Sequence, residues 1–131
     1  MGHTMAIELD RDFDETVAAA RTALADNGFG VLTEIDMRAT LKAKLDVDIA
    51  PQIILGACRP PLAYAALQAD PSIAVFLPCN VVVRSLGDGR TIVEAMDPAF
   101  MVEVIADKEG IEPIAADARQ RIQTALDSLA S

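Results

Sequence analysis

The sequence predicts a single α+β domain with an antiparallel or mixed sheet and helices packed on one face. Its 131 residues suffice for one domain with a proper core, but not for two of ordinary size. Strand and helix patterns alternate at first, and a turn signal at Gly87–Gly89 then joins two strands directly, which makes that pair antiparallel. Because two helical patterns without an intervening strand follow, a doubly wound parallel sheet is the less favoured alternative.

The N-terminal part predicts a strand, a helix and a second strand. Met5–Asp10 alternates apolar and polar positions, which is typical of a strand with one buried face. Asp12 is the expected N-cap of the helix, and Asn27-Gly28 ends it because Gly adopts the left-handed conformation common at helix ends. Phe29–Ile35 then predicts a strand packed by helices on one side.

A short helix, a loop and a short strand are predicted next. Asp36 is the expected N-cap of a helix to about Leu45, in which apolar residues recur every four positions and basic residues face solvent. Val47–Pro51 has no period and predicts a loop. Ile53–Leu55 predicts a short buried strand that stops at Gly56.

Prolines mark the next two junctions. Pro60-Pro61 predicts the first turn of a helix, since Pro suits that position, and Asp70-Pro71 ends the helix. We interpret Ile73–Leu77 and Asn80–Leu86 as one long strand broken at Pro78, which cannot donate a ladder hydrogen bond. Such irregularities are frequent beside functional sites.

The C-terminal part predicts the rest of a hairpin and two helices. Thr91–Met96 is the second strand of the hairpin. Asp97-Pro98 begins a short helix through about residue 106, and Gly110 breaks it. The last helix spans about residues 113–130 and has one apolar face.

The composition argues against nucleic-acid and membrane partners. The formal net charge is −9 and the basic residues are scattered, so a nucleic-acid backbone would be repelled. No apolar run approaches the roughly 20 residues of a membrane-spanning helix. We interpret residues 1–4 as a tail ahead of Met5. Since they show no secretory pattern, we expect a cytoplasmic protein whose two cysteines are thiols.

Cys58 is the first candidate for chemistry. It stands at a strand end just before a proline-started helix, where the partial positive charge of the helix N-terminus favours the thiolate. Arg59 would add to that effect and is a predicted ligand-binding residue. The alternative is that Cys58 is a small buried residue of the core.

Cys79 follows Pro78 at the expected strand break. If its strand neighbours the strand before Cys58, both cysteines lie at the same end of the sheet, as a redox pair or as two soft metal ligands. Their separation matches neither C-x-x-C nor a zinc knuckle, and His3 is the only histidine. We therefore predict no metal site.

Several polar residues could complete a pocket near the cysteines. Arg84 would clamp an anion, Asn80 would donate and accept hydrogen bonds, and Tyr64 would act as an acid or a hydrogen-bond donor. Pairing on a solvated face also accounts for Arg84 and Glu94, and a helix N-cap role accounts for Asp97. Nucleotide-binding, zinc-protease and serine-hydrolase motifs are absent, and no cofactor is identified.

Four segments, FGVLTEIDM, ILGACRPPLA, LQADP and LPCNVVV, carry a family resemblance. With them the chain resembles the domain of unknown function 302 family from about Phe13 to Leu129. Arg59 stands where that family typically has Asn, within Gly-Ala-Cys-Asn-Pro-Pro. The resemblance implies a β-α-β(4)-α architecture with a curved sheet, similar to the fold of the TATA-box-binding protein, and it implies no activity.

The residues thus favour a small-ligand-binding domain, with a cleft near Cys58 and Cys79, that forms a homodimer. A second hypothesis is a thiol-based redox protein in which Cys58 is the nucleophile and Cys79 the resolving cysteine. A third is a structural or interaction module without a ligand. The sequence leaves open whether the chain is an enzyme.

Overall fold

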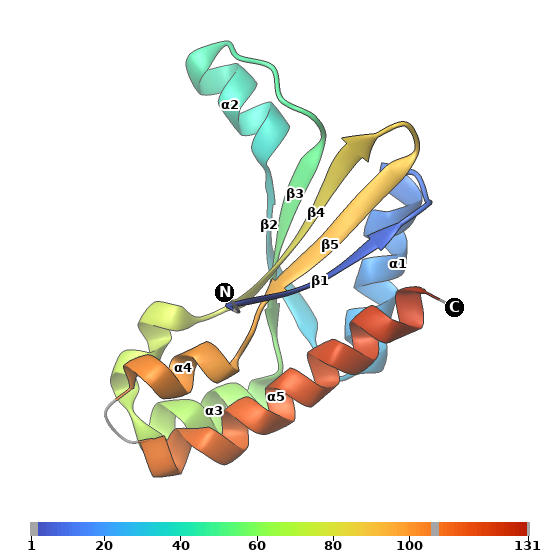
Figure 1. The fold of residues 1–131 in the computed structure, drawn as a ribbon. Coiled ribbons are helices and arrows are strands. Elements are labelled where there is room, and N and C mark those ends of the chain that lie inside the picture. The colour runs from blue at the N-terminus through green and yellow to red at the C-terminus, as the bar shows by residue number, and fades with distance from the viewer. Residues whose placement is uncertain (1–2, 106–107, 131) are drawn as a thin grey trace.

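One five-stranded antiparallel sheet organises the protein (Figure 1). The computed structural model describes residues 3–105 and 108–130. The strands are β1 (Thr4–Leu9), β2 (Gly30–Asp36), β3 (Gln52–Cys58), β4 (Cys79–Gly87) and β5 (Arg90–Met96). The helices are α1 (Phe13–Asp26), α2 (Met37–Leu45), α3 (Pro60–Ala69), the 3-10 helix η1 (Pro71–Phe76), α4 (Ala99–Val104) and α5 (Lys108–Leu129). The predicted single α+β domain is confirmed.

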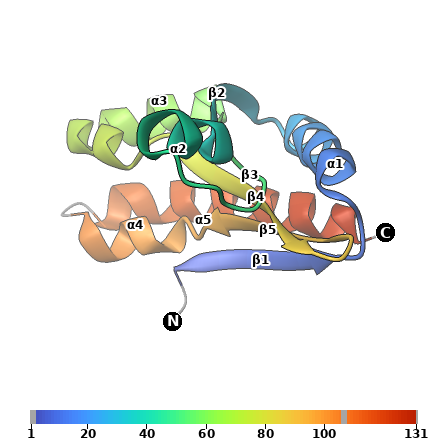
Figure 2. The ribbon, with the colours of Figure 1, turned by 90° about the horizontal axis from the view of Figure 1, so that it is seen from above.

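The strands follow the order β1-β5-β4-β3-β2, and every neighbouring pair is antiparallel. Figure 2 shows β1 and β2 at the two opposite edges of the sheet. The chain order is β-α-β(4)-α, as the family resemblance implies, with α2, α3, η1 and α4 inserted in the connections.

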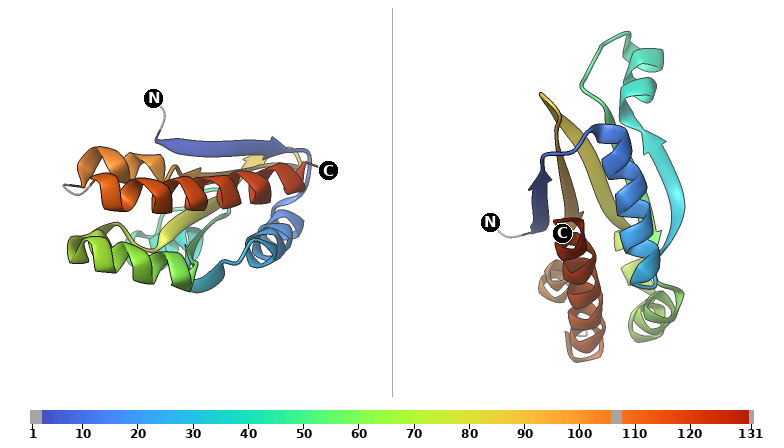
Figure 3. Two further views of the ribbon diagram at one scale, coloured as in Figure 1. Left: turned by 90° about the horizontal axis from the view of Figure 1, so that it is seen from below. Right: turned by 90° about the vertical axis from the view of Figure 1, so that its right-hand side faces the viewer.

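Helices α1 and α5 cover one face of the sheet, as the right-hand view of Figure 3 shows. Alternation along the strands supplies the apolar side of this core. The strand residues in the core are Met5, Leu9, Leu55, Ala57, Val81, Val83, Val93 and Ala95. From the helices, Ala20 and Leu24 of α1 and Ile122 and Leu126 of α5 meet them. The predicted packing of helices on one face is therefore observed.

A second apolar cluster lies beyond the end of the sheet, where α3, η1, α4 and the first turns of α5 meet (Figure 3, left). Its buried members are Ala66, Ile73, Met101, Ile105, Ile111 and Ala115. Both α3 and α4 pack against α5. The end of the sheet that carries the cysteines is thus enclosed by helices.

The opposite end of β2 and β3 carries α2, which projects beyond the sheet (Figure 1). The Asp36 carboxylate caps this helix by accepting a hydrogen bond of 2.9 Å from the Ala39 N–H, as predicted. None of its residues is buried. The apolar periodicity thus predicted the helix correctly, but no other element covers its apolar side chains fully.

The expected strand at Ile73–Leu77 is wrong, because most of that segment forms η1. Pro71 occupies the first turn, and the Asp70 carboxylate accepts a hydrogen bond of 2.9 Å from the Ser72 N–H. Ile73 is fully buried whereas Val75 is 82% exposed, so this apolar run has one buried side and not two.

Two boundaries also differ from expectation. β3 does not stop at Gly56 but continues to Cys58, because its pairing with β2 and β4 continues past Gly56. Gly56 lies so close to Thr33 and Pro78 that only a residue without Cβ fits there. Gly110 lies inside α5, which begins at Lys108 and not near residue 113. Burial of Ile111 outweighs the roughly 1 kcal/mol that a helical glycine costs. The expected end of the preceding helix near residue 106 lies outside the described residues.

Within the described parts of the chain, no helix is both long and apolar enough to cross a membrane.

Candidate functional site

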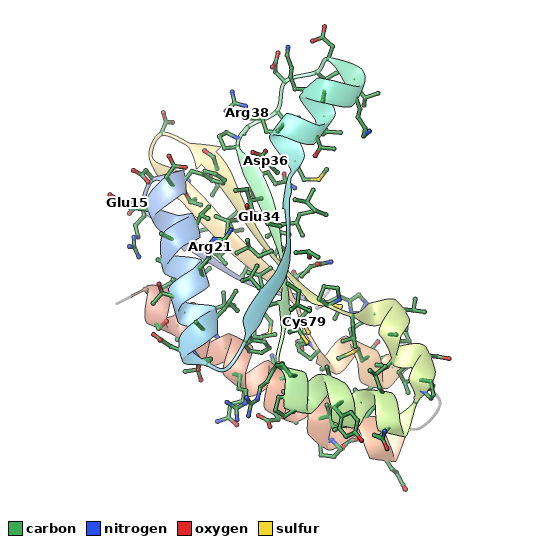
Figure 4. The ribbon with its side chains drawn as sticks, turned by 180° about the vertical axis from the view of Figure 1, so that it is seen from behind. Glu15, Arg21, Glu34, Asp36, Arg38 and Cys79 are labelled. Carbon is green, nitrogen blue, oxygen red and sulfur yellow. The ribbon has the colours of Figure 1, made fainter. Side chains whose placement is uncertain are left out.

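Strand register brings the two cysteines together at one end of the sheet. Ala57 pairs directly with Cys79 across β3 and β4, so Cys58 is one residue from the partner of Cys79. Both thiols are free; Cys79 is buried and Cys58 is half-buried. Figure 4 shows Cys79 beside α3, at the end of the sheet.

Between the sheet end and α3 lies a small pocket with room for about two water molecules, with a volume near 30 Å³. Both cysteines and Arg59 line it, and the remaining walls are apolar. Those walls are formed by Phe29, Ala57, Leu62, Ala63, Ala66, Leu77, Met101, Ile114 and Ala118. Such a pocket suits a ligand with an apolar part and few polar contacts.

The pKa of the Cys79 thiol is raised from its ordinary 9.0 to about 11. Burial is the larger cause, and the negative charge of a nearby Cys58 thiolate is the smaller one. Cys79 is therefore a protonated thiol at neutral pH. Of the two sulfurs, the half-buried Cys58 is the one that a reagent in solvent can reach.

Arg59 lies between the pocket and the turn that ends α1. A Cβ added at Gly28 would lie 2.6 Å from Arg59 Nη1, so the guanidinium rests directly on that glycine. Gly28 also has φ +87°, which is a second reason why glycine stands at this position. The Nε atom of Arg59 is buried and has no hydrogen-bond partner within the part of the chain that the structure describes.

The other residues predicted for the site do not line the pocket. Tyr64 is 67% exposed on α3. Asn80 is exposed and follows the buried Cys79, so it points to the other face of the sheet. Arg84 forms an ion pair with Glu94, with 3.6 Å between Nη2 and Oε1, on that same face. Their roles as ligand-binding residues stay predictions.

Asp97 and His3 have structural contacts. One Asp97 oxygen accepts a hydrogen bond of 2.9 Å from the Ala99 N–H, and the carboxylate pairs with Arg119 at 3.0 Å. The His3 ring lies 4.4 Å from the Phe100 ring, centroid to centroid. No group of three or more metal-binding side chains occurs among residues 3–105 and 108–130.

Sequence reasoning missed most of the apolar wall. Ala66, Met101 and Ala118 line the pocket, although none of them was a candidate site residue. The small-residue face of α3 was the available signal, because small side chains leave space where larger ones would fill it. Phe29 was assigned to a strand, and only its place after the Asn27-Gly28 turn indicates that it meets α3.

Comparison with known proteins places this geometry in one family. A family profile described as "Domain of unknown function DUF302" matches residues 5–129. The crystal structure of an uncharacterized conserved DUF302 protein from Bacillus stearothermophilus is similar, with 29% identity and a TM-score of 0.87, over 97% of this chain and 98% of that one. Among curated proteins none matches. The chain belongs to the DUF302 family, for which neither comparison supplies a function.

Proposed function

We propose that the protein binds a small ligand in the pocket beside Cys58 and Cys79. The observation that carries this proposal is the combination of an apolar cavity, two thiols and one guanidinium at the end of a sheet. Apolar walls gain from excluding water, and a few polar groups can fix the orientation of what binds. The volume limits the enclosed part of the ligand to a few heavy atoms.

The test is native mass spectrometry of the purified protein, combined with amide NMR titration of a library of small fragments. We expect a bound mass or shifts at pocket residues that Ala63→Leu abolishes, since Ala63 lines the pocket. Ala43→Leu is the matched control, because Ala43 is an exposed alanine on α2. If neither a bound mass nor pocket shifts are found in the unmodified protein, ligand binding is excluded.

A second candidate is thiol redox chemistry, favoured by the strand register, which places Cys58 one residue from the partner of Cys79, and by the shared pocket. With a hydroperoxide as oxidant, the Cys58 thiolate would attack one peroxide oxygen, the O–O bond would break and water or an alcohol would leave. The Cys79 thiol would then attack the resulting sulfenic sulfur, and release of water would leave a disulfide. In the proposed cytoplasmic location a reductant would restore both thiols.

The redox candidate predicts a Cys58–Cys79 disulfide after one equivalent of hydrogen peroxide. Peptide mapping detects it, and Cys79→Ser should instead accumulate a sulfenic acid at Cys58. Unchanged thiols after this treatment would contradict the candidate. Because fragment binding requires no oxidant, the two functions are tested separately.

We further propose a homodimer in which a second copy contacts α2. Leu45 and Val47 are 65% and 42% exposed there. No residue of Met37–Leu45 is buried within the chain, so a second copy would cover apolar side chains that are exposed there. Light scattering should give a dimer mass that Leu45→Glu lowers and Val75→Glu, at the other end of the molecule, does not. A monomer mass for the unmodified protein up to 200 µM would contradict it.

A further inference from the structure

Arg59 gives the pocket a positively charged group. It is the one residue of the pocket lining that is always charged, and the other members are apolar residues and two cysteines. No carboxylate is found among the described residues that line the pocket, although the chain as a whole carries a net charge of −9. The local charge is therefore opposite in sign to that of the molecule.

Most other arginines are paired with acids, and this one is not. Arg21, Arg84, Arg90, Arg119 and Arg121 each form an ion pair with Asp or Glu. Within the described ranges Arg59 forms none, and its buried Nε donates to no acceptor. A half-buried guanidinium without an acidic partner is costly, whereas an anionic oxygen beside its accessible atoms would form a charge-assisted hydrogen bond.

The start of α3 favours the same sign of charge. The ten-residue helix has no side-chain cap at Arg59, and Pro60 and Pro61 have no N–H of their own. The Leu62 N–H is thus the first one at this helix end, and the Leu62 side chain lines the pocket. The partial positive charge of the helix N-terminus adds to that of the guanidinium.

The walls decide which class of anion fits. The side chains of Leu62, Leu77 and Met101 offer no hydrogen bonds. An anion with polar oxygens on every side would therefore lose its hydrogen bonds to water on all sides, and the protein would replace them on only one. A carboxylate on a short alkyl chain avoids this loss. Its planar head matches the guanidinium fork, and its chain is apolar.

We propose that the ligand of this pocket is a short-chain aliphatic carboxylate, with its head on Arg59 and its alkyl chain against the apolar walls. The inference rests on the proposed binding function and names its ligand class. A volume near 30 Å³, with room for about two water molecules, encloses about two carbons of the alkyl chain.

The experiment titrates the protein with sodium butyrate, 1-butanol and butylammonium chloride at constant ionic strength, and follows amide NMR shifts. The three probes share an alkyl chain and differ in head-group charge. We expect all three probes to shift the amide signals of Leu62, Ala63 and Met101. The affinity read from these shifts should be at least tenfold higher for butyrate than for butanol, and lowest for butylammonium. Arg59→Gln should remove this preference, whereas Arg90→Gln should keep it, because Arg90 pairs with Glu8 at the hairpin end of the sheet, away from the pocket.

The outcomes separate the ligand class from the binding function. Equal affinity for butyrate and butanol would overturn the carboxylate inference while leaving a binding pocket. The absence of pocket shifts with all three probes would overturn both. Because the comparison of probes uses the unmodified protein, it decides the matter even if Arg59→Gln unfolds. Arg59→Lys gives a second check, with an intermediate preference expected since charge remains but the planar fork is lost.

Discussion

The antiparallel pair β2 and β3 has two ends that differ in how the chain beyond them is packed. At the end formed by Gly30 and Cys58, β3 continues into α3, which α5 and η1 enclose. At the end formed by Asp36 and Ile53, β2 continues into α2, which packs mainly against β2 and β3. The first end has a fully buried cluster and a pocket, and the second buries no helical residue.

The comparison teaches that helical amphipathicity and helical packing are separate properties. Along α2 the apolar residues Met37, Leu41 and Leu45 recur every four positions, as in a helix that packs on a core. Leu45 is nevertheless 65% exposed. Along α3 the buried residue is the small Ala66, and packing succeeds because apolar elements surround it. Burial depends on the neighbours that the topology provides.

The largest expected difference between the two ends is in core energetics. Ile73→Ala removes a fully buried side chain from the cluster at the pocket end, and we expect a loss of about 2–5 kcal/mol in the free energy of unfolding. Leu45→Ala on α2 should cost about 0.5 kcal/mol or less in the monomer. Urea unfolding at low micromolar concentration measures both. Equal losses would contradict the difference in packing.

The prediction from sequence followed the same division. The strands, the caps at Asp12 and Asp36, the hairpin and the antiparallel class were predictable because each depends on local pattern and turn chemistry. Ile73–Leu77 was wrong because a short apolar run has the same composition in a buried strand and in a 3-10 turn with one buried side. The junction of Cys58 and Cys79 could be suspected from the strand ends, but the pocket walls come from five separate segments. Sequence gives no measure of the space between them.

The second largest expected effect is a pH dependence of the free energy of unfolding. It arises at the pocket end, which holds the buried ionisable group Cys79, whereas α2 has no buried residue. The folded-state pKa of Cys79, about 11, exceeds its ordinary 9.0. The proton is therefore held more tightly in the folded state. The resulting stability is fully present below about pH 9 and is lost as the pH rises through 11, and two pKa units correspond to about 3 kcal/mol.

The measurement is the free energy of unfolding between pH 8 and pH 11 for the unmodified protein and for Cys79→Ala. The difference between the two proteins removes contributions that do not depend on Cys79. We expect the unmodified protein to lose stability more steeply over this range than the variant. Parallel curves would show that Cys79 titrates with an ordinary pKa, and hence that the cysteine end is more hydrated than its burial indicates.

A smaller difference in stability is expected between alanine substitutions in two turns, at Gly28 beside Arg59 and at Gly89 in the hairpin. Gly28 and Gly89 both have positive φ, +87° and +74°, so alanine is strained by about 1–2 kcal/mol at either. An added Cβ at Gly28 would also lie 2.6 Å from Arg59 Nη1, whereas at Gly89 nothing lies within 4 Å. We expect Gly28→Ala to be the more destabilising of the two by thermal unfolding.

The same pair tests the position of Arg59. If the guanidinium rests on Gly28, Gly28→Ala introduced into the Arg59→Ala variant should cost only about as much as Gly89→Ala costs in the unmodified protein. An excess that persists without the arginine side chain would mean that the contact is not the cause. It would also weaken the assignment of Arg59 to the pocket wall.

The smallest expected effect comes from two helix caps of the same design. The carboxylates of Asp12 and Asp36 each accept a hydrogen bond from the N–H three residues later, at 2.7 Å for Glu15 on α1 and 2.9 Å for Ala39 on α2. Removing such a cap weakens a helix by about 1 kcal/mol. Because α1 is part of the core, Asp12→Ala should lower the global free energy of unfolding by that amount. Because α2 buries no residue, Asp36→Ala should lower it by about 0.5 kcal/mol or less, and the loss should appear as faster amide exchange confined to α2. A full 1 kcal/mol global loss from Asp36→Ala at low micromolar concentration would mean that α2 unfolds only with the domain, which would remove the contrast between the two ends.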